Sequence, residues 1–147
     1  MVITLSDLRA TERLAVSVAA VARPGDAILL NGPLGAGKTA FARAFLRAAS
    51  GDPALEVPSP SFTLVQTYAT HRGSVHHFDL WRLDGPAALA ELGWDEALDD
   101  IILVEWPDRL GALTPPGALC LDFALGDDEA RVVTVSGWSG RLGLADP

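Results

Sequence analysis

The residues best suited to chemistry lie in the stretch LLNGPLGAGKTAFARAF, residues 29–45. It contains Lys38, the only lysine in a chain that otherwise uses arginine for positive charge. Residues 32–39 fit the pattern G-x-x-x-x-G-K-[ST], in which a glycine-rich backbone turns several N–H groups toward phosphate oxygens. Lysine places a slim point charge where the fork of an arginine would not fit in the same way. The motif therefore predicts a phosphate-binding loop, or P-loop.

This loop and the first turn after it are expected to hold a nucleotide. The expected contacts are Gly35, Ala36, Gly37, Lys38, Thr39 and Ala40. Lys38 reaches the β- and γ-phosphates and acts in catalysis, and the Thr39 hydroxyl binds Mg²⁺. A GTPase of this class would also carry N-K-x-D, which needs a second lysine that the chain does not have.

Mg²⁺-dependent P-loop enzymes also place a carboxylate on a neighbouring strand. Glu105 follows the apolar run IILV, and Asp79 follows VHHF. We expect Glu105 to bind the metal; the alternative is a strand-end carboxylate paired with Arg109. We expect Asp79 to act in catalysis, by orienting the attacking water or contacting a metal-bound water; the alternative is a cap on the turn toward Arg82.

Further polar side chains lie near these carboxylates in the sequence. Ser59, Ser61 and Thr63 form a hydroxyl-bearing loop, VPSPSF and the residue after it, that either senses the γ-phosphate and positions water or is an ordinary ordered turn. His77 lies two residues before Asp79, but no third or fourth ligand at suitable spacing completes a transition-metal site. We expect His77 to form a hydrogen bond within its own hairpin.

These residues need a fold that brings separate strand ends together. Apolar runs and turn signals predict strands over 2–5, 26–31, 63–69, 74–80, 101–104, 117–125 and 130–136, and helices over 7–22, 38–50 and 84–93. Strands and helices alternate, which predicts an α/β fold: a P-loop NTPase-like domain with a mixed central sheet flanked by helices and with two β-hairpin insertions. We expect residues 1–147 to form this single domain.

Composition limits the function classes. The chain is 49% hydrophobic with mean hydropathy +0.25, and its net charge is −8. An acidic protein is poorly suited to an extended footprint on a nucleic-acid backbone. The start of the chain lacks the pattern of a secretory signal, and its apolar runs are too short to span a membrane. We therefore expect a cytoplasmic protein without membrane contact.

Five segments together resemble one family. The segments GPLGAGKT (32–39), VPSPSFTLVQTY (57–68), HFDLWRL (77–83), ELG (91–93) and LVEWPDRLG (103–111) are similar in type and order to the TsaE (YjeE) family. The resemblance implies a small P-loop ATPase that binds ATP and Mg²⁺ and hydrolyses ATP weakly by itself. It matches Lys38 and Thr39 to the P-loop lysine and the Mg²⁺-binding threonine, Glu105 to the magnesium glutamate and Asp79 to the acidic residue of the H-x-D motif.

The resemblance also implies partners. The family acts with the TsaB–TsaD pair, which transfers threonylcarbamoyl to adenosine 37 of tRNAs that read ANN codons, so contact with tRNA is only indirect. Two alternatives remain open from the sequence: a small-molecule kinase of the P-loop class, and a nucleotide-binding scaffold that does not hydrolyse ATP. Turnover of ATP with and without partner proteins distinguishes them.

Overall fold

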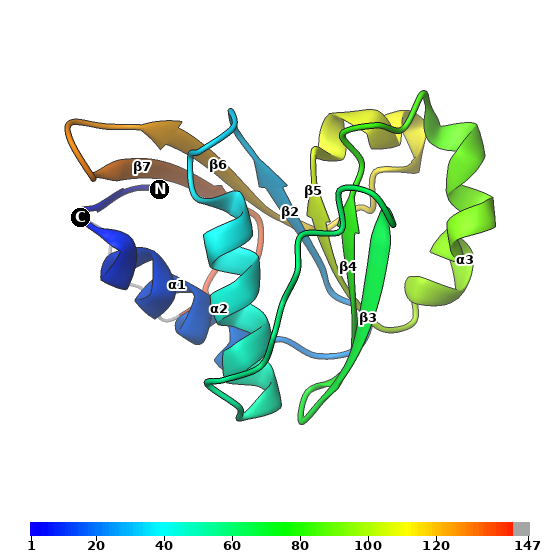
Figure 1. The fold of residues 1–147 in the computed structure, drawn as a ribbon, viewed down its shortest axis with the longest axis horizontal. Helices are drawn as coiled ribbons and strands as arrows, with labels where there is room; N and C mark the ends of the chain where they lie inside the picture. Colours follow the sequence, from blue (N-terminus) through cyan, green and yellow to red (C-terminus); the bar gives the residue numbers. More distant parts are fainter. Residues whose placement is uncertain (143–147) are drawn as a thin grey trace.

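The centre of the computed structural model, which describes residues 1–142, is a seven-stranded sheet (Figure 1). Its strands are β1 (Val2–Leu5), β2 (Ala27–Asn31), β3 (Val65–Thr70), β4 (Gly73–Asp79), β5 (Ile101–Glu105), β6 (Leu119–Leu125) and β7 (Arg131–Ser136). Their order is β1-β7-β6-β2-β5-β4-β3. The four central strands, β6, β2, β5 and β4, are parallel, and antiparallel pairs with β7 and β3 extend them on both sides. The predicted mixed sheet is confirmed.

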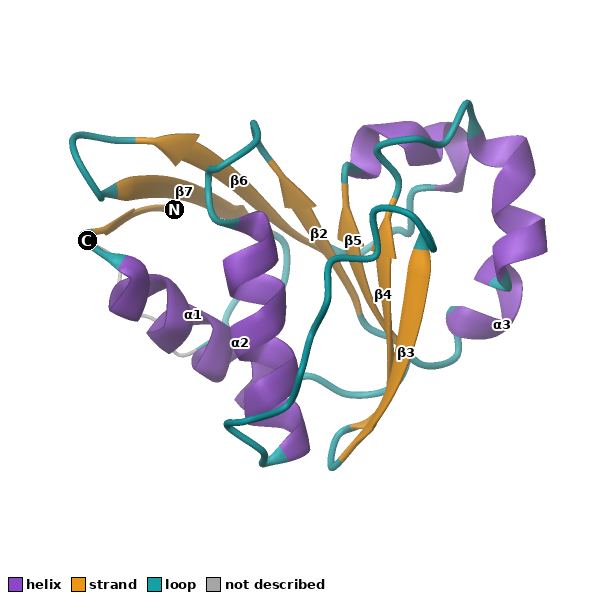
Figure 2. Cartoon of the chain, viewed as in Figure 1, coloured by secondary structure: helices purple, strands orange, loops and turns teal. Residues whose placement is uncertain are grey.

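Helices cover the sheet from both sides (Figure 2). They are α1 (Leu8–Val21), α2 (Lys38–Ser50) and the short α3 (Trp94–Ala97), with 3₁₀ helices η1 (Pro86–Leu92) and η2 (Pro107–Leu113). One hydrophobic core lies between the sheet and the α1–α2 pair, and the other lies between the sheet and α3 with the 3₁₀ helices. Strand β2 serves both, because Ile28 and Leu30 face the first core while Ala27 and Leu29 face the second. This explains the apolar run over its first four residues, Ala27–Leu30.

Local signals in the sequence set the ends of the two long helices. The Asp7 carboxylate accepts a hydrogen bond from the Ala10 N–H at 2.9 Å and caps α1. Gly51, with φ of 66°, ends α2 in a left-handed turn. The helix predicted over 84–93 is a 3₁₀ helix over Pro86–Leu92, and Gly93 (φ 76°) ends it and separates it from α3. Neither α3 nor η2 was predicted.

Among residues 1–142, no helix has both the length and the apolar character that crossing a membrane requires. The prediction of one domain over 1–147 extends to residues 143–147, which lie outside the described residues, and it stays a prediction.

Candidate functional site

The loop between β2 and α2 has the backbone that its glycines predict. Gly32, Gly35 and Gly37 all have positive φ, at 140°, 78° and 108°. A Cβ on Gly32 would lie 2.5 Å from the Phe123 carbonyl oxygen, so a larger residue would collide with β6. Gly37 occupies the cap position of α2 and offers no side chain to its first N–H groups. The start of α2 is therefore a candidate anion site formed by backbone donors and the helix dipole.

One pocket joins this loop to the ends of β4 and β5. Its volume is about 350 Å³, and it is lined by Leu34, Gly35, Gly37, Lys38, Thr39, Ala40, Ser59, Ser61, Asp79, Glu105 and Trp106. Parallel pairing sets Asp79 directly opposite Glu105, so both carboxylates reach the same edge of the sheet. The structure thus brings together residues that are up to about 70 positions apart in the sequence.

Two predicted residues lie outside this pocket. Ala36 is fully buried in the core, and its N–H donates to the Pro33 carbonyl at 3.2 Å. Thr63 accepts a hydrogen bond from the Gln66 side chain, and it does not line the pocket. Of the three hydroxyl-bearing residues before β3, Ser59 and Ser61 are the ones that face the candidate site.

Glu105 is the most constrained carboxylate of the pocket. The residue is 2% exposed; Oε1 accepts from the Thr39 hydroxyl at 2.9 Å, and Oε2 lies 2.7 Å from His77 Nε2. The prediction that His77 bonds within its hairpin was wrong, because its side chain crosses to β5 rather than to β3. Arg109 does not pair with Glu105 and donates instead to the Trp81 carbonyl at 3.4 Å.

Asp79 joins the end of β4 to the turn that follows it and to the Ser59–Ser61 loop. Its Oδ1 accepts from the Trp81 N–H at 3.0 Å, so it does cap the turn toward Arg82. Its Oδ2 accepts from the Ser61 hydroxyl at 3.2 Å, and Ser61 in turn lies 2.8 Å from the Ser59 hydroxyl. The same carboxylate therefore caps the turn and lines the pocket.

Lys38 is held inside the pocket. The residue is 4% exposed; Nζ donates to the Gly32 carbonyl and lies 3.4 Å from the centre of the Trp106 ring. Trp106 has the left-handed φ of 60°, which is costly for a residue with a large side chain. The centre of its ring lies 4.4 Å from the centre of the Trp81 ring. Burial lowers the pKa of Lys38 below its ordinary value, while the carboxylates of Glu105, Asp79 and Asp108 oppose this shift.

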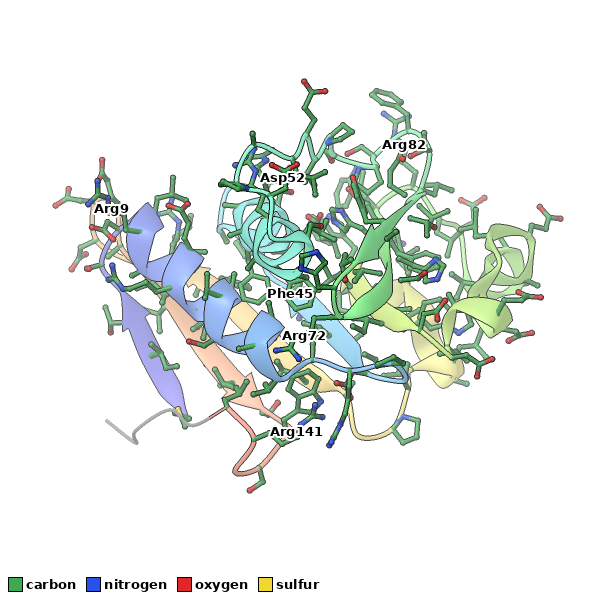
Figure 3. All side chains as sticks on the ribbon, turned by 90° about the horizontal axis from the view of Figure 1, so that it is seen from below. Arg9, Phe45, Asp52, Arg72, Arg82 and Arg141 are labelled. Atoms are coloured by element: carbon green, nitrogen blue, oxygen red, sulfur yellow. The ribbon has the colours of Figure 1, made fainter. Side chains whose placement is uncertain are left out.

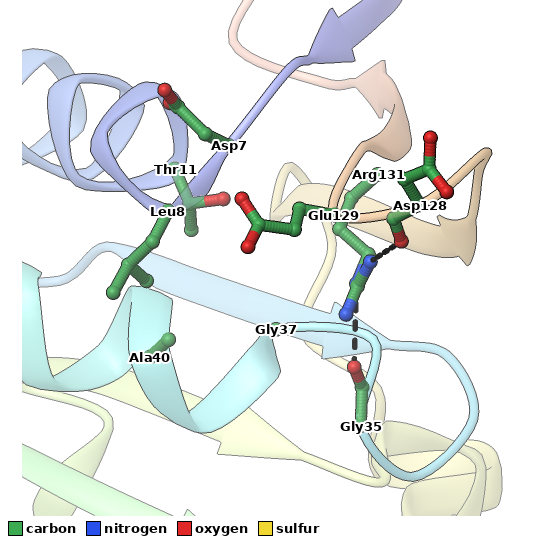
Figure 4. Close-up of a pocket in the computed structure, with 9 residues that line it drawn as sticks. All are labelled: Asp7, Leu8, Thr11, Gly35, Gly37, Ala40, Asp128, Glu129 and Arg131. Atoms are coloured by element: carbon green, nitrogen blue, oxygen red, sulfur yellow. Dashed lines mark hydrogen bonds between the residues drawn. The ribbon is translucent and has the colours of Figure 1, made fainter.

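A second pocket lies on the other side of the P-loop (Figure 4). Its volume is about 390 Å³, and it is lined by Asp7, Leu8, Thr11, Gly35, Gly37, Ala40, Asp128, Glu129 and Arg131. Arg131 donates from Nε to the Gly35 carbonyl at 3.3 Å and so joins β7 to the loop. This pocket is not predictable from the sequence, because its walls come from the start of α1 and the β6–β7 turn, which carry no recognisable motif.

The fold and the loop define the class: four parallel central strands, with a glycine-rich loop between β2 and α2, form a P-loop NTPase fold. A family model described as threonylcarbamoyl adenosine biosynthesis protein TsaE matches residues 5–133. The chain belongs to the TsaE family.

Two relatives and a solved structure support this family assignment. The chain is 36% identical over 143 residues to a protein of Rickettsia felis, covering 97% of this chain and 83% of the relative. It is 32% identical over 133 residues to a protein of Bacillus subtilis, covering 89% and 82%. Both relatives are named tRNA threonylcarbamoyladenosine biosynthesis protein TsaE. The crystal structure of Bacillus subtilis YdiB superposes with a TM-score of 0.76 at 27% identity, covering 97% of this chain and 88% of that one.

Proposed function

We propose that the chain is an ATP-binding, weakly ATP-hydrolysing protein that serves the formation of threonylcarbamoyladenosine at position 37 of tRNA by acting on the TsaB–TsaD pair. The observation that carries the proposal is the pocket that gathers Lys38, Thr39, Asp79 and Glu105 at the start of α2. The names of the TsaE relatives supply the pathway. Because the relatives are named for a step of tRNA modification, we propose a cytoplasmic location without membrane contact.

The proposed contact with tRNA is indirect, through the partner pair. The net charge of the chain is −8, which disfavours a direct footprint on the phosphate backbone. The labelled arginines also do not form one surface: Arg9 and Arg82 lie far apart, and Arg72 and Arg141 lie together at the end of α1, where they donate to the carbonyls of Ala20 and Val21 (Figure 3). Arg141 is occupied by an ion pair with Asp26 at 2.8 Å.

The two pockets suggest the direction in which the nucleotide lies. Phosphates belong at the start of α2, where the backbone donors and Lys38 supply positive charge. The second pocket has carboxylates, Asp128 and Glu129, that would repel phosphates but accept hydrogen bonds from ribose hydroxyls or a base amino group. Leu8 and Ala40 offer apolar surface to a base. We propose that ATP crosses the P-loop, with its nucleoside in the second pocket.

Thr39 and Glu105 are a suitable pair of oxygen ligands for Mg²⁺. This ion takes oxygen ligands, and it is usually held by one or two protein groups together with nucleotide phosphates and water. When bound, Mg²⁺ would neutralise charge on the β- and γ-phosphates. Lys38 holds the transferring phosphate, and Asp79 or Ser61 positions the attacking water. Both oxygens of Asp79 are already engaged, by Trp81 and Ser61, which is consistent with slow hydrolysis in the isolated protein.

We expect ATP hydrolysis to be slow in the isolated protein and to rise at least about tenfold when the TsaB–TsaD pair is added. The physical reason is that a partner pressing on the Ser59–Ser61 loop can release Asp79 from Ser61 and leave it free to orient water. Phosphate release is measured with and without the pair, and Lys38→Ala serves as the blank. Fast hydrolysis that the pair leaves unchanged would contradict the proposal, and a phosphorylated small-molecule product would indicate a kinase instead.

ATP affinity is expected to fall at alkaline pH. Burial lowers the pKa of Lys38 in the free protein, whereas bound phosphates favour the charged ammonium and raise the pKa again. Between these two pKa values the complex binds a proton that the free protein has lost. Affinity is therefore constant below the free-protein pKa and decreases as pH rises through it.

Calorimetry in buffers of different ionisation enthalpy measures this proton uptake directly. An ATP affinity that stays constant from about pH 7 to about pH 10, where an ordinary lysine only begins to titrate, would contradict the prediction.

A further inference from the structure

His77 is a buried polar side chain with a single hydrogen bond. It lies on β4 and is 0% exposed, and its Nε2 lies 2.7 Å from Glu105 Oε2. Its other ring nitrogen, Nδ1, is also buried and has no hydrogen-bond partner among the described residues. A buried nitrogen without a partner is unfavourable. The bond to Glu105 is therefore the polar interaction that distinguishes histidine from an apolar residue at this position.

The surroundings of the ring determine where its proton lies. A carboxylate is an acceptor, so Nε2 carries the proton and donates it to Glu105 Oε2. His77 therefore acts as a directional donor to Glu105.

The two carboxylate oxygens of Glu105 have different partners. Oε2 is occupied by His77, while Oε1 faces the hydroxyl of Thr39 at 2.9 Å. Thr39 is the other residue that we propose for Mg²⁺. We propose that His77 is a positioning residue: it fixes the Glu105 carboxylate so that Oε1 is presented to the cation or to water bound to it. This inference rests on the proposed function.

Donors behind a metal-binding carboxylate orient it, and their loss typically lowers metal affinity about 10–100-fold. A purely structural role for His77 makes a different prediction. If His77 only filled space in the core, a leucine of similar volume would serve, and metal affinity would follow the stability of the fold. The two roles are therefore distinguished by metal affinity measured separately from nucleotide affinity.

The test compares His77→Leu, His77→Gln and Val75→Ala in the full chain. Leucine removes the donor, whereas the side-chain amide of glutamine restores an N–H near the place of Nε2. Val75 is equally buried and lies on the same face of β4 two residues earlier, so its truncation weakens the core without touching Glu105. ATP affinity is measured by calorimetry in EDTA, and Mn²⁺ affinity of the ATP complex by electron paramagnetic resonance.

We expect His77→Leu to lower Mn²⁺ affinity at least about tenfold and to change metal-free ATP affinity less than about twofold. His77→Gln should recover most of the metal affinity, and Val75→Ala should keep it while lowering the melting temperature. If His77→Leu does not fold, His77→Phe replaces it, because its ring is closer in shape to imidazole.

Wild-type Mn²⁺ affinity in the leucine or phenylalanine variant would overturn the inference. An equal loss in the glutamine variant or in Val75→Ala would also overturn it, because the effect would then follow packing. If the wild-type protein bound ATP but showed no metal binding in the complex, the proposed metal site itself would fail, and the role of His77 with it.

Discussion

Replacing Lys38 with alanine is expected to lower ATP affinity at least about 100-fold while the fold stays intact. The chain has no other lysine, and Lys38 is the side-chain cation that lines the pocket at the start of α2. Hydrogen bonds to charged groups contribute about 1.5–3 kcal/mol each, so losing two of them to phosphate oxygens costs at least about 3 kcal/mol. Every 1.4 kcal/mol is about a factor of ten in affinity, which gives the expected loss.

The fold should survive because α2 is anchored elsewhere. Phe41 and Phe45 are fully buried, and their rings stack with centres 6.4 Å apart. Circular dichroism checks the fold, and calorimetry measures ATP affinity. Arg43→Ala is the matched control: Arg43 lies on the same helix but lines neither pocket beside the P-loop.

Lys38→Arg separates charge from shape. The ammonium lies 3.4 Å from the centre of the Trp106 ring and donates to the Gly32 carbonyl, in a space that suits a slim group. We therefore expect arginine to recover little of the lost affinity although it restores the charge. A folded Lys38→Ala protein with undiminished ATP affinity would refute the phosphate-site assignment.

The central strands and the P-loop could be predicted because their signals are local. Residues 27–30 and 101–104 are continuous apolar runs, which is typical of parallel strands buried on both faces. The P-loop motif lies directly between such a strand and an amphipathic helix, where the fold requires it. In these cases neighbouring residues alone carry the information.

The other features of the candidate site depend on contacts between segments that are distant in the sequence. The bond from His77 to Glu105 spans 28 positions and exists because β4 pairs with β5 rather than only with β3. The hydrogen bond from Arg131 to Gly35 spans 96 positions and forms one wall of the second pocket. Strand order decides both contacts, and neither segment carries a motif that identifies its partner.

Trp106 illustrates a third limit. The sequence indicates that this residue follows Glu105, but its left-handed φ of 60° is what turns the ring back over Lys38. Backbone strain of this kind is imposed by tertiary packing, and in general it costs about 1–3 kcal/mol. Propensity alone would place an extended or helical residue there.

Replacing Glu105 with glutamine is expected to lower Mg²⁺-dependent ATP hydrolysis at least about 100-fold, since removing a single preorganised charge-stabilising group commonly costs about 10²–10³ in rate. Metal-free ATP affinity should change less than about twofold, because Glu105 contacts Thr39 and His77 rather than the backbone donors expected to hold the phosphates. Glutamine removes the negative charge that favours a divalent cation. It also replaces one carboxylate oxygen by an NH₂ group, which donates hydrogen bonds and does not accept them. Glutamine therefore cannot accept from both Thr39 and His77 as the carboxylate does.

Asp79→Asn is the matched comparison, because Asp79 lies opposite Glu105 in the same pocket and undergoes the same chemical change. We expect this variant to keep the Mg²⁺ dependence of ATP binding and to lose hydrolysis, since its proposed role is to orient water. Phosphate release and calorimetry over a range of Mg²⁺ concentrations measure both effects. If Glu105→Gln kept the Mg²⁺ dependence of the wild type while Asp79→Asn lost it, the metal role would move to Asp79, and Glu105 would be a carboxylate that only joins α2 and β4 to the end of β5.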